Sequence, residues 1–170
     1  MIFKAAQFAA HAHAGQTRKF TGRPYIEHPM RVAGRVTMLP CATEEMVAAA
    51  WLHDVIEDCY ITYDHLESVF DPTVASRVLE LTNPSIKHKH LHRKQRKQID
   101  RDHFRTVSKE AKIIKLLDRI DNVRDMSGAE DGFKRVYLDE TLMLGTVLLE
   151  IDDDIKPLYI ELITELKSLL

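Results

Sequence analysis

The sequence predicts an all-α fold, organised as a single domain over residues 1–170. Apolar residues recur at helical spacing along nearly the whole chain, and prolines, glycines and helix-capping residues divide them into separate segments. Only the hairpin-like stretch "KFTGRPY" hints at an extended pairing. Because a chain of this length can bury a core without disulfides or a structural metal, we expect a bundle of helices.

Three helices are expected in the first third of the chain. The first covers residues 3–13, where apolar side chains return every three or four positions, and it ends in the turn-rich loop "GQTRKFTGRP". The second covers residues 27–38, because a proline is tolerated in a first helical turn and Pro40 stops the pattern. The third runs unbroken through "TEEMVAAAWLHDVIED", residues 43–58, with Thr43 as its N-cap.

The helical pattern continues through the rest of the chain. A short helix opened by Thr62 or Tyr63 ends at Phe70, and Pro72 opens the next one. The stretch "NPSIKHKH" is expected to be a loop that leads into a basic helix. Ser108 is a suitable N-cap for "KEAKIIKLLDRIDNVRDM". The last two expected helices cover residues 130–149 and 154–168.

Composition and charge exclude several classes of protein. No window approaches about 18 consecutive apolar residues, and the N-terminus lacks the apolar region of a signal peptide, so no membrane partner is expected. Cys41 and Cys59 are isolated, which suits a reduced compartment and makes the cytoplasm the expected location. The formal net charge of −2 gives no general attraction to nucleic acid. The basic run "KHKHLHRKQRK" lacks interleaved aromatic residues, so no nucleic-acid partner is expected either.

The most informative motif is "HDVIED". On a helix, Glu57 lies four residues after His53 and Asp58 lies four after Asp54, so four polar groups gather on neighbouring parts of one face. That face begins in the apolar run "AAAWL". Burying an imidazole and three carboxylates there costs on the order of several kcal/mol unless a cation or other partners satisfy them. A metal ion would satisfy them.

A second acidic motif, "KLLDRIDNVRD", ends another apolar run. Asp118, Asn122 and Asp125 fall at i, i+4 and i+7 of a helix. If Asp118 approached His53, Asp54 and one further histidine, the set would offer two nitrogens and two carboxylate oxygens, with open positions for water. Such a mixed set suits Mn²⁺, with Fe²⁺, Co²⁺, Zn²⁺ and Mg²⁺ as competitors.

Most of the other histidines have a simpler interpretation. His65 lies in a short polar helix, and the histidines of the basic run lie in a solvated region. His11 and His13 suit packing or the surface of the first helix. This leaves His28, just before Pro29 at a helix start, as the best remaining candidate for a metal ligand.

Taken together, in this order and spacing, "HAGQTRKFTGRPYIEHP", "LHDVIED" and "KLLDRIDNVRDM" resemble the hydrolase domain of the RelA/SpoT family. This family is a branch of the HD metal-dependent phosphohydrolases, and the resemblance covers roughly residues 3–126, with a looser continuation through "YLDETL". It implies an HD-type helical bundle with one divalent metal, usually Mn²⁺. The implied activity removes the 3′-pyrophosphate from guanosine tetra- and pentaphosphate, so the implied partner is a small nucleotide.

The resemblance also implies roles for particular residues, carried over motif by motif. The implied metal ligands are His28, His53, Asp54 and Asp118. The implied catalytic pair, which orients or activates the attacking water, is Glu57 and Asp58. The implied contacts with the nucleotide come from Arg18, Lys19 and Asn122.

Several alternatives remain open on the sequence alone. Asp121 stands where many members have histidine or tyrosine, and "RKFTGRPY" is one residue longer than in some bifunctional members. Both departures touch the nucleotide side of the site, so adenosine alarmones and NADPH are alternative substrates. A non-catalytic nucleotide sensor is a further alternative, although such a protein should lack the ED pair or a metal ligand. The long bifunctional members carry a synthetase domain after this one, whereas residues 1–170 resemble the small hydrolase-only proteins, so synthesis is not expected.

Two surface features also have two interpretations. The basic segment 87–97 could close over the pyrophosphate end of a substrate or form a solvated face. The apolar side of the last helix could pack within the bundle or against another subunit, so a homo-oligomer is compatible with the sequence.

Overall fold

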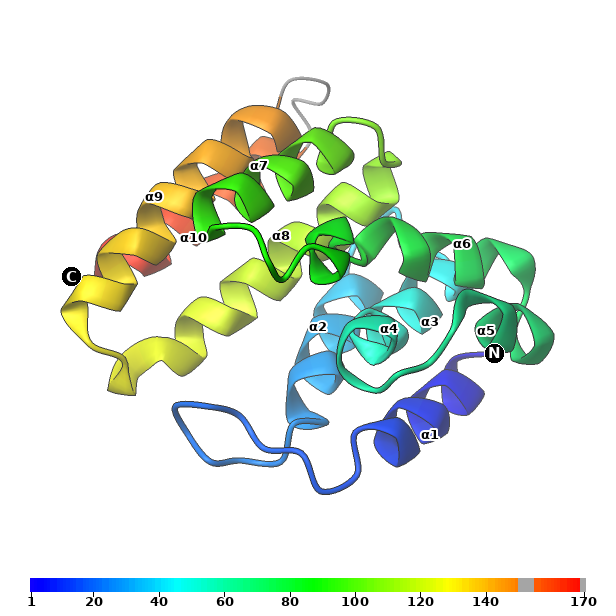
Figure 1. Ribbon diagram of the computed structural model, residues 1–170. Helices are drawn as coiled ribbons and strands as arrows, with labels where there is room; N and C mark the ends of the chain where they lie inside the picture. Colours follow the sequence, from blue (N-terminus) through cyan, green and yellow to red (C-terminus); the bar gives the residue numbers. More distant parts are fainter. Residues whose placement is uncertain (150–154, 169–170) are drawn as a thin grey trace. The chain divides into compact units, whose positions relative to one another are not determined.

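The structure is a computed structural model, and it describes residues 1–149 and 155–168. Over these residues the regular elements are all helices, which confirms the predicted all-α class (Figure 1). The hairpin-like stretch contains one isolated antiparallel bridge, between Thr17 and Pro24. None of the helices in the described ranges combines the length and apolar composition that crossing a membrane requires. The chain divides into two compact units, Met1–Thr82 and Asn83–Leu170.

The first unit is organised around α3, against which α1, α2 and α6 all pack. Three consecutive alanines of α3, residues 48–50, are completely buried, and their small side chains allow neighbouring helices to approach closely. Thr43 caps α3 by accepting a hydrogen bond from the Met46 amide, as the sequence predicts. The helices of this unit are α1 (Ile2–Ala12), α2 (Glu27–Thr37), α3 (Glu44–Leu52), α4 (Val55–Asp58), α5 (Tyr63–Val69) and α6 (Pro72–Leu81).

The second unit is built on α8, which is buried along most of its length and packs against α10. Ser108 caps this helix through the Ala111 amide, as predicted. Leu162 and Leu166 of α10 are each 1% exposed, so the last helix buries apolar residues within its own unit. The elements are η1 (Pro84–Lys87), α7 (Arg93–Phe104), α8 (Lys109–Arg124), η2 (Asp125–Gly128), α9 (Asp131–Leu148) and α10 (Lys156–Ser168).

Helices α9 and α10 meet at a glycine. A Cβ atom added to Gly145 would overlap a ring carbon of Tyr159, far inside van der Waals contact. The missing side chain therefore makes room for the Tyr159 ring between the two helices.

The structure corrects the predicted helix over residues 43–58, which is interrupted at His53 and Asp54. The His53 ring donates from Nδ1 to the Ala50 carbonyl oxygen at 2.8 Å. In a regular helix this carbonyl would accept the amide of Asp54, so the ring takes over the acceptor on which the next turn depends.

Two smaller differences concern the second unit. The stretch predicted as a loop contains the short 3₁₀ turn η1. The predicted start of the last helix, at residue 154, lies outside the described residues.

Candidate active site

The first unit contains two buried histidines whose Nε2 atoms face each other. His28, at the start of α2, is fully buried, and His53, at the break between α3 and α4, is 2% exposed. Their Nε2 atoms lie 3.1 Å apart. His53 donates a hydrogen bond from Nδ1 to a carbonyl oxygen, so in the neutral ring Nδ1 carries the proton. Its Nε2 atom then has a lone pair that can coordinate a metal ion.

Asp54 adds a carboxylate to this pair. Its Oδ2 lies 3.1 Å from Nε2 of His53 and 3.5 Å from Nε2 of His28. Burial opposes ionisation of this carboxyl, but the adjacent His53 and His28 rings outweigh that penalty and hold the pKa of Asp54 well below its ordinary value. Three of the four predicted metal ligands therefore meet within the first unit.

Tyr25 joins this group, although it is not among the site residues predicted from the sequence. Its hydroxyl lies 2.7 Å from Oδ2 of Asp54 and 3.0 Å from Oδ2 of Asp58, and it can donate its proton to either. Burial and the two negative charges raise the pKa of Tyr25, so the hydroxyl stays protonated and remains a donor. Its position three residues before His28, in "YIEHP", is the signal from which this role could have been suspected.

The predicted catalytic pair lies on α4, directly after the break. Asp58 keeps one-turn spacing from Asp54, since its amide donates to the Asp54 carbonyl oxygen at 2.9 Å. Burial and the nearby charge of Asp54 raise the pKa of Asp58. Glu57, half-buried, precedes it on the same short helix. The interruption therefore preserves the grouping of Asp54 with Asp58 that an unbroken helix predicts.

The loop before α2 places the two predicted basic residues differently. Arg18 is half-buried, and its guanidinium carbon lies 5.2 Å from the centre of the Tyr25 ring. Gly22, at a φ of +69°, closes this loop by donating from its amide to the Arg18 carbonyl oxygen. Lys19 is exposed, with its ammonium over the ring of Phe20. Arg18 therefore adjoins the residues around Asp54.

The fourth predicted ligand, Asp118, belongs to the second unit, where it is 4% exposed on α8. Its Oδ1 accepts a hydrogen bond from Nδ2 of Asn122 at 2.5 Å, which places the predicted nucleotide contact one turn away. Its Oδ2 lies 3.0 Å from the ammonium of Lys115. Both oxygens of this buried carboxylate therefore have defined neighbours on the same helix.

Among the described residues, the buried side chains that could each offer one ligand atom to a divalent metal ion are His28, His53 and Asp118. The Nε2 atom of His53 fits such an ion, because Nδ1 carries the proton of the neutral ring and Nε2 therefore offers a lone pair. Imidazole nitrogens with carboxylate oxygen form a donor set that several first-row divalent metals accept.

Comparisons with known proteins identify the family of this chain. A family model described as HD domain matches residues 5–148, a range that includes every predicted site residue. Guanosine-3′,5′-bis(diphosphate) 3′-pyrophosphohydrolase MESH1 of Drosophila melanogaster is 36% identical over 127 residues, which are 74% of this chain and 69% of that protein. The human MESH1 protein is 38% identical over 128 residues, with the same coverage of 74% and 69%.

A bacterial relative and a solved structure extend the comparison. The bifunctional (p)ppGpp synthase/hydrolase SpoT of Escherichia coli is 35% identical over 146 residues, which are 82% of this chain and 20% of that protein. A solved structure of a metazoan ortholog of SpoT, which hydrolyses ppGpp, has a TM-score of 0.83 and 29% identity. This similarity covers 99% of the present chain and 96% of the other.

Proposed function

Because the chain belongs to the HD domain family, and within it to the MESH1 and SpoT type, we propose that it is a guanosine-3′,5′-bis(diphosphate) 3′-pyrophosphohydrolase. The reaction cleaves guanosine tetra- or pentaphosphate with water, releasing pyrophosphate and GDP or GTP. The observation that carries the proposal is the buried pair of histidines whose Nε2 atoms face each other beside Asp54. A substrate of this kind makes a small nucleotide the partner of the site.

The proposed metal ligands are His28, His53 and Asp54 from the first unit and Asp118 from the second. The family model supports this set, because it spans both units without interruption. Mn²⁺ is the proposed ion, and Fe²⁺, Co²⁺, Zn²⁺ and Mg²⁺ are its competitors for this donor set. When bound, the ion would lower the pKa of a coordinated water and neutralise phosphate charge.

Glu57 and Asp58 are the proposed acceptors of the proton that the attacking water loses. The raised pKa of Asp58 supports this role, because a more basic carboxylate takes up a proton more readily. Tyr25 restrains the same carboxylate through its hydroxyl, which fixes the orientation of Asp58 relative to Asp54. The group that receives the proton is thus held in place before substrate binds.

The proposed nucleotide contacts are Arg18, Lys19 and Asn122. The guanidinium of Arg18 lies against the Tyr25 ring, and its planar face and donors suit either a base or a phosphate. Asn122 donates to Asp118, which connects a sugar contact to a metal ligand through one hydrogen bond. Lys19 is exposed and can reach a phosphate as a point charge.

The two units are proposed to act as one HD-type domain over residues 1–170, located in the cytoplasm with its nucleotide substrate. The family model supports this, since residues 5–148 match as one segment. A homo-oligomer remains a prediction.

A product assay tests the proposed function. The purified protein, loaded with Mn²⁺, is incubated with guanosine tetraphosphate, and the expected products are GDP and pyrophosphate in equal amounts. Parallel incubations with adenosine alarmones and with NADPH determine which nucleotide is turned over fastest. Absence of pyrophosphate release from guanosine tetraphosphate, in protein shown to contain metal, would contradict the proposal.

A further inference from the structure

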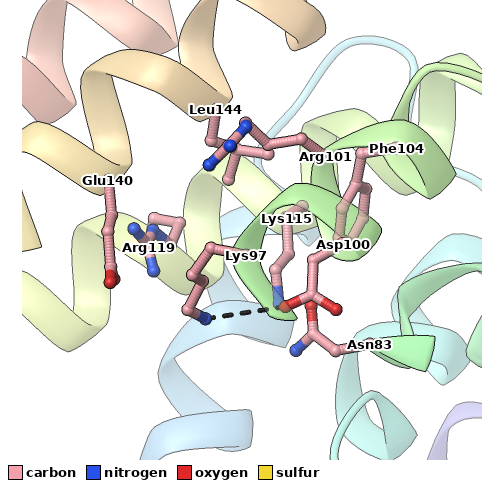
Figure 2. Close-up of a pocket in the computed structure, with 9 residues that line it drawn as sticks. All are labelled: Asn83, Lys97, Asp100, Arg101, Phe104, Lys115, Arg119, Glu140 and Leu144. Carbon is pink, nitrogen blue, oxygen red and sulfur yellow. Dashed lines mark ion pairs between the residues drawn. The ribbon is translucent and has the colours of Figure 1, made fainter. Parts of the chain in front are cut away.

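The second unit contains a small cavity lined mainly by charged side chains. Its volume is about 40 Å³, and residues of α7, α8 and α9 contribute to its wall (Figure 2). The four cationic residues of the wall are Lys97, Arg101, Lys115 and Arg119. This space is large enough for a few water molecules or one small oxyanion, and far too small for a nucleoside.

The acidic residues of the wall are already engaged. Asp100 accepts hydrogen bonds from the amide of Ser85 at 3.2 Å and from its hydroxyl at 3.0 Å. Glu140 accepts two hydrogen bonds from Arg93, at 2.5 and 3.0 Å. Arg93 does not line the cavity, so the negative charge of Glu140 is neutralised by a residue outside the wall. The wall is therefore left with an excess of positive charge.

Among the cationic residues of the wall, Arg119 has the least compensation from neighbouring carboxylates. The residue is 9% exposed, and its guanidinium packs over the Tyr137 ring, 4.0 Å from the ring centre. One terminal nitrogen donates to the hydroxyl of Thr141 at 2.7 Å. Its buried Nε has no hydrogen-bond acceptor among the described residues, nor does a described carboxylate form an ion pair with this arginine. Leaving a buried guanidinium without a negative partner is costly.

Lys97 lies beside Arg119 and strengthens the positive field. Burial and the charge of Arg119 lower the pKa of Lys97. Its ion pair among the described residues, at 3.7 Å, is with Asp100, a carboxylate that Ser85 already engages twice. Figure 2 shows the guanidinium of Arg119 beside the side chain of Lys97, whose ammonium is joined to Asp100 by a dashed line. Two neighbouring cations, one buried and one half-buried, repel each other, and both are stabilised when an anion enters between them.

We propose that this cavity binds one phosphate group, held by the ammonium of Lys97 and the guanidinium of Arg119. Guanidinium and ammonium donors form short, charge-assisted hydrogen bonds with phosphate oxygens. The phosphate could be free inorganic phosphate or a phosphate of the bound nucleotide. The second source rests on the proposed function. Lys115 supports it, because this residue of the cavity wall also contacts Asp118, a proposed metal ligand.

Calorimetric titration with inorganic phosphate tests the proposal without depending on activity. The protein is stripped of metal with a chelator, and the ionic strength is held constant. The wild-type chain is expected to bind one phosphate. Arg119→Gln and Lys97→Gln are each expected to weaken that binding about tenfold or more, the loss of one charge-assisted contact. The Lys97→Gln substitution should disturb folding less than Arg119→Gln, because the side chain of Lys97 is 33% exposed.

Arg124→Gln provides the matched control. Arg124 lies on the same helix as Arg119, but its guanidinium is bonded to Glu161 and Glu165, outside the cavity. This variant is expected to bind phosphate as the wild-type chain does. Absence of phosphate binding by the wild-type chain, or an equal loss in the control, would overturn the proposal.

Steady-state kinetics then identify the source of the phosphate. If the cavity takes a phosphate of the nucleotide, inorganic phosphate competes with guanosine tetraphosphate and Lys97→Gln raises KM. If it takes free phosphate, the inhibition is not competitive and KM is unchanged. A protein that bound phosphate in the cavity but did not hydrolyse guanosine tetraphosphate would refute the proposed function and leave the phosphate site standing.

Discussion

Tyr25 shows how one side chain organises the charges of the first unit. Its hydroxyl stands between Asp54 and Asp58, two carboxylates with opposite pKa shifts. The lowered pKa of Asp54 keeps this residue ionised, as its proposed role as a metal ligand requires, while the raised pKa of Asp58 favours proton uptake. The environment therefore gives the proposed ligand and the proposed base opposite pKa shifts within one short segment.

Replacing Tyr25 with phenylalanine removes the hydroxyl that contacts Asp54 and Asp58 and keeps the aromatic ring. Because a hydrogen bond to a charged group contributes about 1.5–3 kcal/mol, we expect kcat to fall roughly 10- to 100-fold with the metal content unchanged. Tyr63→Phe is the control, since its hydroxyl donates to Glu67 at the surface of the same unit. Equal kinetics for wild type and Tyr25→Phe would show that Asp58 needs no such restraint.

His53→Ala is expected to abolish metal retention and hydrolysis together. The substitution removes the ring whose Nε2 faces His28, and the remaining ligands leave the coordination incomplete. Elemental analysis of the purified variant, beside its activity, is the measurement. His65→Ala, at an exposed position of α5, should retain metal and activity. A His53→Ala protein with full metal content would exclude His53 as a ligand.

Glu57→Gln separates water activation from metal binding. The amide keeps the size of the side chain but cannot accept a proton, so turnover should fall by two orders of magnitude or more, by the usual size of general-base catalysis. Metal content should match the wild type. Near-normal rates would remove Glu57 from the catalytic machinery.

At the scale of single elements, the contact between α9 and α10 depends on an absent side chain. Gly145→Ala would force a methyl group into the Tyr159 ring, so the ring or the helix must move. We expect the free energy of unfolding to fall by about 1–3 kcal/mol, the usual cost of overpacking. Urea denaturation followed by circular dichroism measures it.

Gly132→Ala is the control on the same helix. Nothing lies within 4 Å of a Cβ atom added there, so the higher helix propensity of alanine should leave stability unchanged or slightly increased. Similar losses in both variants would mean that the cost at residue 145 does not come from Tyr159.

At the scale of the whole molecule, the proposed ligand set draws on residues of both units. A metal that binds only the folded chain stabilises it by about 2.7 kcal/mol when its concentration is 100 times its Kd. Addition of Mn²⁺ to metal-free protein should therefore raise the Tm by several degrees, and a chelator should reverse the change.

Asp118→Asn tests the contribution of the second unit to that shift. We expect the Mn²⁺-dependent rise in Tm to be largely lost, because the amide is a poorer ligand than a carboxylate. Asp125→Asn, seven residues further along the chain, should respond as the wild type does. An undiminished shift in Asp118→Asn would confine the metal site to the first unit.

Sequence patterns were sufficient where structure depends on neighbours along the chain. Thr43 and Ser108 cap their helices as predicted, because a cap needs only an amide three residues away. The break at His53 was missed, because it depends on a ring turning back to a carbonyl. The bridging position of Tyr25 was missed for a related reason: the loop carries its hydroxyl to Asp54, 29 residues away in sequence.

The charged cavity was the least predictable feature. The basic run that includes Lys97 looks equally like a solvated face when read along the chain. The surroundings of Lys97 depend on Arg119 of α8 and Glu140 of α9, and only the folded second unit places these residues around one cavity.

The interruption between α3 and α4 also limits how this protein could be engineered. A redesign that maximised helix propensity over residues 44–58 would replace His53 with alanine or leucine, free the Ala50 carbonyl and join the two helices. The resulting chain should melt at a higher temperature than the metal-free parent and be inert. Stability screens applied to this segment would therefore select against catalysis, and libraries should hold residues 53 and 54 fixed.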